Sequence, residues 1–219
     1  MSLFRSLPPF RADVVGSYLR PAALKKARHD FEKGMMSAQA LRAEEDKAIR
    51  YSVERQCACG LQVVTDGEFR RTWWHFDFFD GLEGVERYDT QEGIQFSGVQ
   101  TKSHNVRVTG KVRFGDHPML QDFAFLQSLQ TGATPKMTIP SPSVLHFRGG
   151  RDVVSPEIYP NLDEFFDDLV QTYRDALAAF YAAGCRYLQL DDTVWGYLCS
   201  EEQKQLVRER GDDPDVLAK

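Results

Sequence analysis

Leu61-Gln-Val-Val-Thr-Asp-Gly-Glu-Phe-Arg-Arg71 joins a short apolar run to a strongly polar turn. The run Leu61–Val64 predicts a buried strand, because short continuous apolar runs are typical of strands covered on both faces. Two carboxylates and two guanidinium groups follow at once, from Asp66, Glu68, Arg70 and Arg71. Ligands of α/β proteins bind at the carboxyl ends of the strands. The stretch therefore predicts an α/β enzyme with a site where this strand ends.

The composition is that of one ordinary globular domain. The chain has 219 residues, of which 42% are hydrophobic and 12% aromatic, enough for one sizeable core. The net charge of -5 and the pI of about 5.6 argue against a nucleic-acid or membrane-surface partner. No apolar run approaches the roughly 18 residues of a membrane span, and the start lacks an apolar signal-peptide region. We expect a cytoplasmic protein.

The cysteines and histidines do not predict a metal site. Four cysteines are too few for a disulfide scaffold, and thiolate-rich metal sites usually show Cys-x-x-Cys spacing rather than Cys57-Ala-Cys59. We interpret Cys57 and Cys59 as packing residues at the end of an amphipathic helix, and Cys185 and Cys199 as core thiols. The histidines are scattered without a partner spacing. No dinucleotide fingerprint, phosphate loop or nucleophile elbow is present.

Strand and helix patterns alternate along much of the chain. We expect a strand within Ala12–Arg20, two helices between Pro21 and Gly60, strands at 61–64, about 135–140 and 186–192, and helices at 161–183 and 200–210. Gly34 is expected to separate the first two helices, with Ser37 and Asn161 as N-caps and Gly60 and Gly184 as terminating glycines. Residues 212–219 are expected to form a polar tail.

Residues 73–131 interrupt this alternation. Runs such as Gly93–Val99 and Asn105–Phe114 alternate with period two, which predicts a β-hairpin excursion, and Pro118–Gln130 predicts a helix. Four strands with intervening helices predict parallel βα architecture. A complete (β/α)8 barrel needs about 250 residues. Residues 1–219 are therefore expected to form an incomplete TIM-barrel domain, with about four βα units and the 73–131 excursion after strand two.

Polar residues follow each expected strand. Gly16-Ser17 offers a backbone amide and a hydroxyl to an anionic group, or is simply a tight turn. Asp66 and Glu68 would face the same way if the segment is extended; the alternative is that they form ion pairs with the following arginines.

The third and fourth strands end in hydroxyls and acids. Thr138-Ile-Pro-Ser-Pro-Ser143 places hydroxyls on a proline-stiffened loop, which suits hydrogen bonding to a ligand and equally a structural loop. Asp191-Asp192 precedes Trp195, and because adjacent strand residues face opposite sides, at most one of these acids faces a pocket. The other is expected either to support the residues that line the pocket from behind or to cap the next helix. An ammonium group is the natural partner of such an acid.

Taken together, these strand ends resemble the cobalamin-independent methionine synthase family, specifically its single-barrel, methionine synthase II-like members. The matching segments, in the family's order, are Val14–Pro21, Thr65–Arg71 followed by Trp73–Phe79, Thr138–Ser143 and Tyr187–Asp192. The resemblance implies a barrel that binds homocysteine and zinc and transfers a methyl group from methyltetrahydrofolate to the zinc-bound thiolate. Zinc lowers the pKa of a bound thiol.

The resemblance also implies roles for individual residues. Gly16 and Ser17 match the segment near the amino-acid carboxylate, and Glu68 and Asp191 match the acids that hold its ammonium group. Residues on the folate side are implied to be Ser103, Arg107, Ser141, Ser143 and Trp195. No residue of this chain is implied to be catalytic in the narrow sense.

The chain departs from the family at the metal. The family's zinc ligands, a His-x-Cys pair, a Glu and a further Cys, are expected beyond residue 219, and none of the four cysteines matches a ligand position. We expect a zinc-dependent methyltransferase domain without its metal ligands. Two alternatives stay open: a related zinc-thiol alkyltransferase that does not use folate, and a non-catalytic binding or assembly module. An incomplete barrel would leave sheet edges uncovered and favour self-association.

Overall fold

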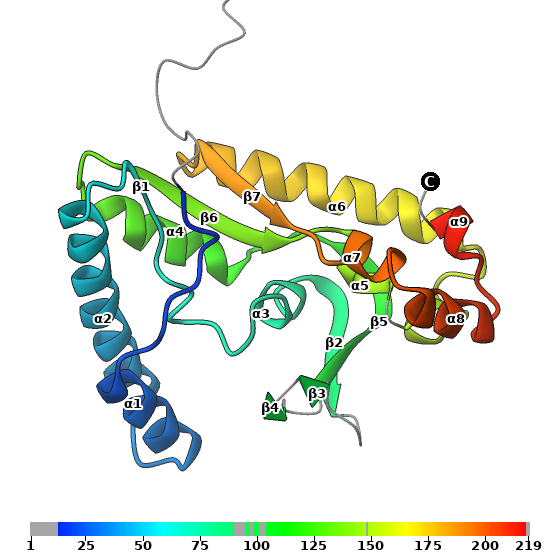
Figure 1. Cartoon of the computed structure of the whole chain (residues 1–219), viewed down its shortest axis with the longest axis horizontal. Helices are drawn as coiled ribbons and strands as arrows, with labels where there is room; N and C mark the ends of the chain where they lie inside the picture. Colours follow the sequence, from blue (N-terminus) through cyan, green and yellow to red (C-terminus); the bar gives the residue numbers. More distant parts are fainter. Residues whose placement is uncertain (1–12, 90–94, 97–98, 101–103, 148, 218–219) are drawn as a thin grey trace, which may run out of the picture. The chain divides into compact units, whose positions relative to one another are not determined.

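The computed structural model describes residues 13–89, 95–96, 99–100, 104–147 and 149–217 (Figure 1). The helices are α1 (Ala22–Glu32), α2 (Ala38–Ala58), α3 (Phe76–Phe79), α4 (Pro118–Ser128), α5 (Ser143–His146), the 3-10 helix η1 (Gly150–Val153), α6 (Leu162–Ala182), α7 (Val194–Leu198), α8 (Glu201–Glu209) and α9 (Pro214–Leu217). The strands are β1 (Val63–Val64), β2 (Glu83–Asp89), β3 (Gln95–Phe96), β4 (Val99–Gln100), β5 (His104–Arg113), β6 (Thr134–Pro140) and β7 (Tyr187–Asp191).

The chain divides into two compact units. The first unit comprises the residues up to Trp74, Met119–Thr138 and Ala179–Gln189. The second comprises His75–Pro118, Ile139–Ala178 and the residues from Leu190 onward. The strands β6 and β7 and the helix α6 each run from one unit into the other.

A three-stranded sheet has the order β1-β6-β7. β1 pairs with β6 in parallel, with Val63 opposite Thr134. The predicted α/β class with a parallel sheet is confirmed. The strand expected within Ala12–Arg20 is reduced, in its described part, to an isolated parallel bridge between Ser17 and Gly67. The physical reason is that side chains use its carbonyl groups: Lys136 donates to the oxygen of Val14.

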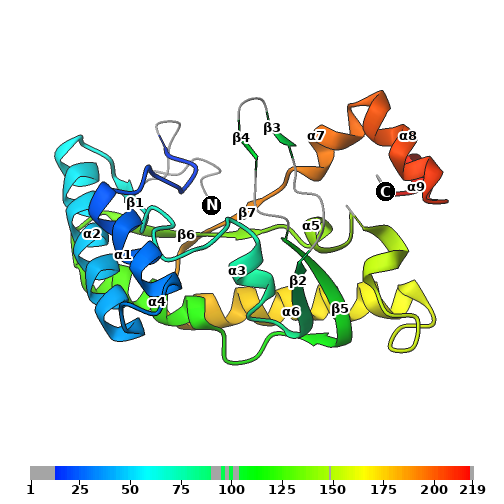
Figure 2. The same cartoon turned by 90° about the horizontal axis from the view of Figure 1, so that it is seen from below.

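The helices α1 and α2 lie side by side in the first unit (Figures 1 and 2). The predicted break falls at Gly34, which has φ of +72°, and Ser37 caps α2 by accepting a hydrogen bond from the amide of Ala40 at 3.2 Å. Gly60, with φ of +83°, follows the helix as predicted. The buried side chains that form the core between these helices, β1 and α4 are Leu24, Ile49, Val53, Val64, Phe69 and Leu126.

A buried charge network ties α2 and α4 to the segment after β1. The side chain of Arg70 is 4% exposed and lies 2.7 Å from Asp46, 3.1 Å from Asp122 and 3.7 Å from Glu45. Its guanidinium also stacks over the Phe125 ring, 4.6 Å from the centroid.

Two further arginines complete this network. Arg28 lies 2.9 Å from Glu45, and Arg42 lies 2.7 Å from Asp122. Burial raises the pKa of both acids, and the arginines only partly offset that shift. The network therefore places carboxylates where water cannot stabilise them, and the arginines supply the compensating charge.

The second unit contains the antiparallel pair β2 and β5, which lie side by side in Figure 2. Its core is aromatic, and Phe78 packs against Tyr173 with ring centroids 5.7 Å apart. The fully buried Tyr159 accepts a hydrogen bond from the amide of Val112 and donates one to Asp168, both at 2.8 Å. Asn161 caps α6 as predicted, accepting from the amide of Asp163 at 2.9 Å.

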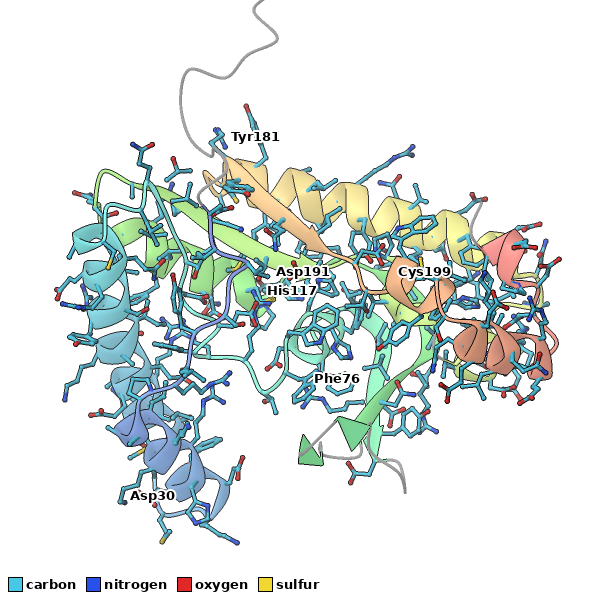
Figure 3. The ribbon with its side chains drawn as sticks, viewed as in Figure 1. Asp30, Phe76, His117, Tyr181, Asp191 and Cys199 are labelled. Carbon is cyan, nitrogen blue, oxygen red and sulfur yellow. The ribbon has the colours of Figure 1, made fainter. Side chains whose placement is uncertain are left out.

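Several local predictions were wrong. Residues 214–217, expected in a polar tail, form the helical turn α9. Cys199, expected as a core thiol, follows α7 and is exposed (Figure 3), and Cys59 is exposed at the end of α2. Cys185 is buried as predicted. The short helices α3, α5 and α7 were not predicted, because four or five residues carry too few positions for a helical period.

Within the part of the chain that the structure describes, no helix has both the length and the apolar character needed to cross a membrane.

The charge network predicts a large cost for losing its central cation. Arg70→Met should destabilise the chain by about 3–5 kcal/mol near pH 7, because it leaves buried carboxylates without compensation. Burial already raises the folded pKa of Asp122 and of Glu45 above their ordinary values of 3.8 and 4.5. The cost should therefore be fully present where both acids are ionised, and it should shrink as the pH falls through those raised pKa values and protonates them. Urea unfolding at several pH values measures it.

The matched control is Lys26→Met, which removes an exposed i,i+4 ion pair with Asp30 on α1. It should cost no more than about 0.5 kcal/mol and show little dependence on pH. Equal costs for the two variants would contradict the role assigned to Arg70.

Candidate functional site

The segment after β1 is a tight turn that its own side chains hold together. The hydroxyl of Thr65 donates to the oxygen of Gly16 at 2.6 Å and accepts from the amide of Gly67 at 3.1 Å. Asp66 accepts from the amide of Glu68 at 2.9 Å. The expectation that Asp66 and Glu68 face one way along an extended segment was wrong, because the chain turns here and the Asp66 carboxylate is used inside the turn.

Glu68 has an unusual backbone conformation. Its φ is +56°, in the left-handed region that side chains other than glycine seldom adopt. Such residues cost about 1–3 kcal/mol and persist only where the surroundings impose them. Here Arg20 holds the backbone on both sides, donating to the oxygen of Glu68 at 2.8 Å and to that of Arg71 at 2.6 Å. The turn therefore fixes where the Glu68 side chain begins.

The Glu68 carboxylate is buried and partnered within the first unit. Its side chain is 8% exposed, and Oε1 accepts a hydrogen bond from the hydroxyl of Thr138 at 2.9 Å. Arg71 lies 3.4 Å from the same oxygen. Arg71 is itself fixed, because it donates to the backbone oxygen of Thr138 at 2.5 Å and to that of Trp74 at 3.1 Å. The result is a carboxylate with a fixed direction and a buried counter-charge.

Gly16 packs directly against this carboxylate. A Cβ atom at Gly16 would lie 2.8 Å from Cγ2 of Thr138 and 3.2 Å from Oε1 of Glu68. Only glycine leaves room for that contact. Ser17 follows it in the bridge to Gly67 and is exposed. The structure thus brings Gly16 and Glu68 together, with Ser17 at the adjoining surface.

A buried lysine lies two residues before Thr138 on β6. The side chain of Lys136 is 1% exposed and pairs with Asp13 at 2.9 Å. Tyr187 donates to the same carboxylate at 2.6 Å. Burial alone would raise the pKa of Asp13, but the hydrogen bonds from Tyr187 and Lys136 together lower it. This group ties the segment before Gly16 to β6 and β7.

In the second unit, the expected acids stand at the end of β7, where Figure 3 labels Asp191. The backbone oxygen of Asp191 accepts from the amide of Ser141 at 2.8 Å. Asp192 accepts from the amide of Val194 at 2.7 Å and from the hydroxyl of Ser143 at 3.0 Å. Asp192 thus contributes to the start of α7, a helix that was not predicted, rather than to the helix expected at 200–210.

The remaining predicted residues are more scattered. Ser141 and Ser143 share a hydrogen bond at 2.7 Å, and Trp195 is 58% exposed on α7. Arg107 is exposed on β5 and pairs with Glu86 at 3.3 Å. Ser103 lies outside the described residues. The structure therefore brings Ser141, Ser143 and Asp191 together and gives Arg107 a separate partner on the hairpin.

Sequence reasoning missed the residues that hold Glu68 and its surroundings. Thr138, Arg20 and Lys136 carry these contacts; all three lay in segments already noted, but none of them was given a role. The sequence did indicate a polar contact at β6. Lys136 and Thr138 are two residues apart in a strand, so their side chains point to the same face. Two polar residues on one face of a buried strand predict a polar partner opposite them.

Among the residues that the structure describes, no group of three or more His, Cys, Asp or Glu side chains is arranged to hold a metal ion.

Comparison with known proteins gives one consistent group. The family model described as "Cobalamin-independent synthase, Catalytic domain" matches residues 10–207. The chain is 50% identical over 217 residues to YxjG of Bacillus subtilis (strain 168), described as uncharacterized, covering 99% of this chain and 57% of that protein. It is 24% identical over 186 residues to a methionine synthase of Saccharolobus solfataricus, covering 85% and 53%.

A solved structure is similar as well. It is of a Listeria monocytogenes protein assigned to the vitamin-B12 independent methionine synthases, with 43% sequence identity and a TM-score of 0.78. The match covers 97% of this chain and 58% of that one. The chain thus spans little more than half the length of these relatives.

The close approach at Gly16 generates a prediction. Gly16→Ala should destabilise the chain by about 1–3 kcal/mol, because the new methyl group must displace Thr138 or Glu68 from a packed position. The control is Gly196→Ala in α7, where a Cβ meets nothing within 4 Å. Alanine should be neutral or slightly stabilising there. Thermal or urea unfolding compares the two, and equal stability of both variants would contradict the packing described.

Proposed function

Since its catalytic-domain model matches residues 10–207, the chain belongs to the cobalamin-independent synthase family, and we propose that it forms the substrate-holding part of a methyltransferase that acts on a homocysteine-like amino-acid thiol. The observation that carries this proposal is the Glu68 carboxylate. It is buried and has a fixed direction: Arg20 holds the left-handed backbone of Glu68, and Thr138 and Arg71 hold its side chain. A structural ion pair needs none of that strain.

We further propose that residues 1–219 are the first part of a (β/α)8 barrel, with residues 73–131 as an insertion. The order of parallel neighbours supports this. The segment around Ser17 bridges to the residues after β1, β1 pairs with β6, and β6 is followed by β7. Parallel neighbours in chain order are the arrangement of a barrel rather than of a doubly wound sheet.

The role proposed for Glu68 is to bind the substrate ammonium group. A carboxylate removed from water gains from a cationic partner, and a charged hydrogen bond is worth about 1.5–3 kcal/mol. Thr138 and Arg71 hold the Oε1 atom, so the carboxylate is oriented before any substrate arrives. Because the carboxylate is already oriented, less conformational entropy is lost when the substrate binds.

Asp191, Ser17 and Gly16 are proposed for the remaining groups of the amino acid. Asp191 ends β7 and is proposed as the second acid for the ammonium group. Ser17 is exposed at the bridge beside Gly67, and its hydroxyl is proposed to donate to the substrate carboxylate. Gly16 is proposed to act by leaving space, since any side chain there would meet Glu68.

For the methyl donor we propose a folate of the 5-methyltetrahydrofolate type, with Ser141, Ser143 and Trp195 on its side. Support comes from the exposed indole of Trp195, which offers a flat surface for a ring system to stack on. Arg107 and Ser103 are proposed for the same side with less support, since Arg107 already pairs with Glu86.

The described residues do not fit a zinc ion. Cys185 donates to the backbone oxygen of Tyr187, while Cys59 and Cys199 are exposed in different units of the chain. We propose that the zinc of the whole enzyme is bound by residues that are not part of this sequence. The contribution of this chain is then to bind and orient the amino acid.

The ammonium role is tested by isosteric changes. Glu68→Gln and Asp191→Asn should each weaken binding of L-homocysteine to the chain by about tenfold or more, since each removes one charged hydrogen bond. Glu86→Gln on the exposed hairpin is the control and should leave affinity unchanged. Titration calorimetry measures all three, and unchanged affinity in the first two variants would remove both acids from the site.

A second ligand separates binding from folding. An analogue of homocysteine without its amino group, 4-mercaptobutyrate, should bind the unaltered chain and Glu68→Gln with nearly the same affinity. A variant that is merely unfolded would lose both ligands equally.

The metal proposal has its own test. After dialysis against a weak chelator, the 219-residue chain should retain far less than one zinc per chain. A longer protein, in which the C-terminal remainder of YxjG follows Lys219, should retain about one. Elemental analysis gives both values. Stoichiometric zinc on the 219-residue chain would show that its own residues form the metal site.

A further inference from the structure

The backbone of residues 14–16 is held by side chains that come from three other segments of the first unit. Three consecutive carbonyl oxygens accept these hydrogen bonds. The donors are Lys136 on β6 to Val14 at 2.5 Å, Gln189 on β7 to Val15 at 3.1 Å, and Thr65 after β1 to Gly16 at 2.6 Å. In a regular sheet, backbone amides of a neighbouring strand would take such oxygens. The path of residues 14–16 is therefore set by side chains.

The contact from Lys136 is part of a small buried cluster. The Lys136 side chain is 1% exposed, and its ammonium group also pairs with the carboxylate of Asp13 at 2.9 Å. The hydroxyl of Tyr187 donates to the same carboxylate at 2.6 Å, and its ring centroid lies 4.8 Å from the ammonium nitrogen. Residues 13 and 14 therefore cannot move along β6 without breaking an ion pair and a hydrogen bond at once.

A buried ion pair is a poor means of gaining stability. Taking an ammonium and a carboxylate out of water costs free energy that their attraction only partly offsets, and apolar residues in their place are often neutral or stabilising. Apolar residues, however, would not hold the Val14 oxygen at one place. The pair between Lys136 and Asp13 therefore fits a role in position better than a role in stability.

The strand β6 links this cluster to the proposed ammonium site. Lys136 and Thr138 are two residues apart and point to the same face of the strand. Thr138 holds the Oε1 atom of Glu68 at 2.9 Å, and Lys136 holds Val14. One strand thus fixes both the acid proposed for the substrate ammonium group and the segment that leads to Ser17, which is proposed for the substrate carboxylate.

The strand β7 holds the same segment from a second direction. Tyr187 and Gln189 are also two residues apart, and they contact Asp13 and Val15. Among the described residues, the strand pairing of this segment is the isolated bridge from Ser17 to the turn after β1, whereas β7 lies at the other end of the order β1-β6-β7. The contacts from β7 therefore cross the face of the sheet, and they restrain the segment where that one bridge would leave it free to shift.

We propose that Lys136, Tyr187 and Gln189 are positioning residues for the end of the substrate that carries its carboxylate. They act through the backbone of residues 13–15, which fixes the adjoining Ser17. The inference rests on the proposed function, in which the hydroxyl of Ser17 binds that carboxylate. It adds a source of specificity, because these side chains favour thiols with a carboxylate over amine thiols without one.

Three thiols separate the two ends of the substrate. L-Homocysteine carries an amino group and a carboxylate, 4-mercaptobutyrate carries the carboxylate alone, and 3-mercaptopropylamine carries the amino group alone. Titration calorimetry on the 219-residue chain measures the affinity for each. Glu68→Gln should weaken binding of the two thiols that carry an amino group, and it serves as the reference for the opposite end of the site.

The mildest test of the inference is Gln189→Met. Methionine has a similar length but cannot donate a hydrogen bond to Val15. The variant should bind L-homocysteine and 4-mercaptobutyrate about tenfold more weakly, since a displaced Ser17 loses a charged hydrogen bond, while 3-mercaptopropylamine binds as before. The control is Gln171→Met on α6, which removes a 2.8 Å hydrogen bond to Asp175 and should leave all three affinities unchanged.

A triple variant separates position from stability. Asp13→Leu, Lys136→Met and Tyr187→Phe together replace the cluster by apolar side chains, so urea unfolding should show little loss of stability. Binding of the two thiols with a carboxylate should nevertheless weaken by about tenfold, as in Gln189→Met. A cluster with a purely structural role would retain its ligand preference whenever stability is retained.

The pattern of losses decides between the outcomes. Unchanged affinities, or equal losses for all three thiols, in Gln189→Met would overturn the inference, and this variant decides alone if the triple variant does not fold. Failure of the proposed function looks different. If the unaltered chain does not bind L-homocysteine, the proposed function and this inference both fall. If Glu68→Gln binds every thiol normally while Gln189→Met shows the selective loss, the acid is misassigned and the positioning role stands.

Discussion

The left-handed backbone of Glu68 is the constraint on which the first unit depends. At φ of +56° this residue can persist only if its neighbours prevent relaxation, and they do so from three directions. Asp66 holds its amide, Arg20 holds its oxygen, and Thr138 holds its carboxylate. The same contacts join the segment before α1, the turn after β1 and the strand β6. One strained residue thus connects three pieces of chain that are distant in sequence.

Elements with local signals were predictable. The ends of α1, α2 and α6 follow from Gly34, Ser37 and Asn161, whose effects act within a few residues. The parallel sheet could be predicted too, and so could the position of Glu68 just after a buried strand, at the end of an α/β sheet where ligands usually bind. Its orientation could not, since the alternation argument holds only for an extended chain, and Gly67 with φ of +68° already begins a turn.

Local sequence patterns could not predict which side chains pair with each other when they lie far apart in the sequence. The adjacent arginines Arg70 and Arg71 were both reasonable partners for Glu68, and it is Arg71 that lies 3.4 Å from its Oε1 atom. Arg70 turns instead to Asp46 on α2 and Asp122 on α4. Which arginine goes where is decided by the packing of two helices, and no spacing in the sequence expresses that. Short helices such as α7 were missed for a related reason, since their ends are set by tertiary contacts such as the one between Asp192 and Ser143.

The contacts that orient Glu68 come from residues that are far apart in the sequence but belong to one compact unit: Arg20, Asp66, Arg71 and Thr138. These contacts give the carboxylate a direction and a counter-charge before any ligand is bound. A group that is oriented in advance reduces the cost of binding, and this is the property that the proposed substrate role of Glu68 requires.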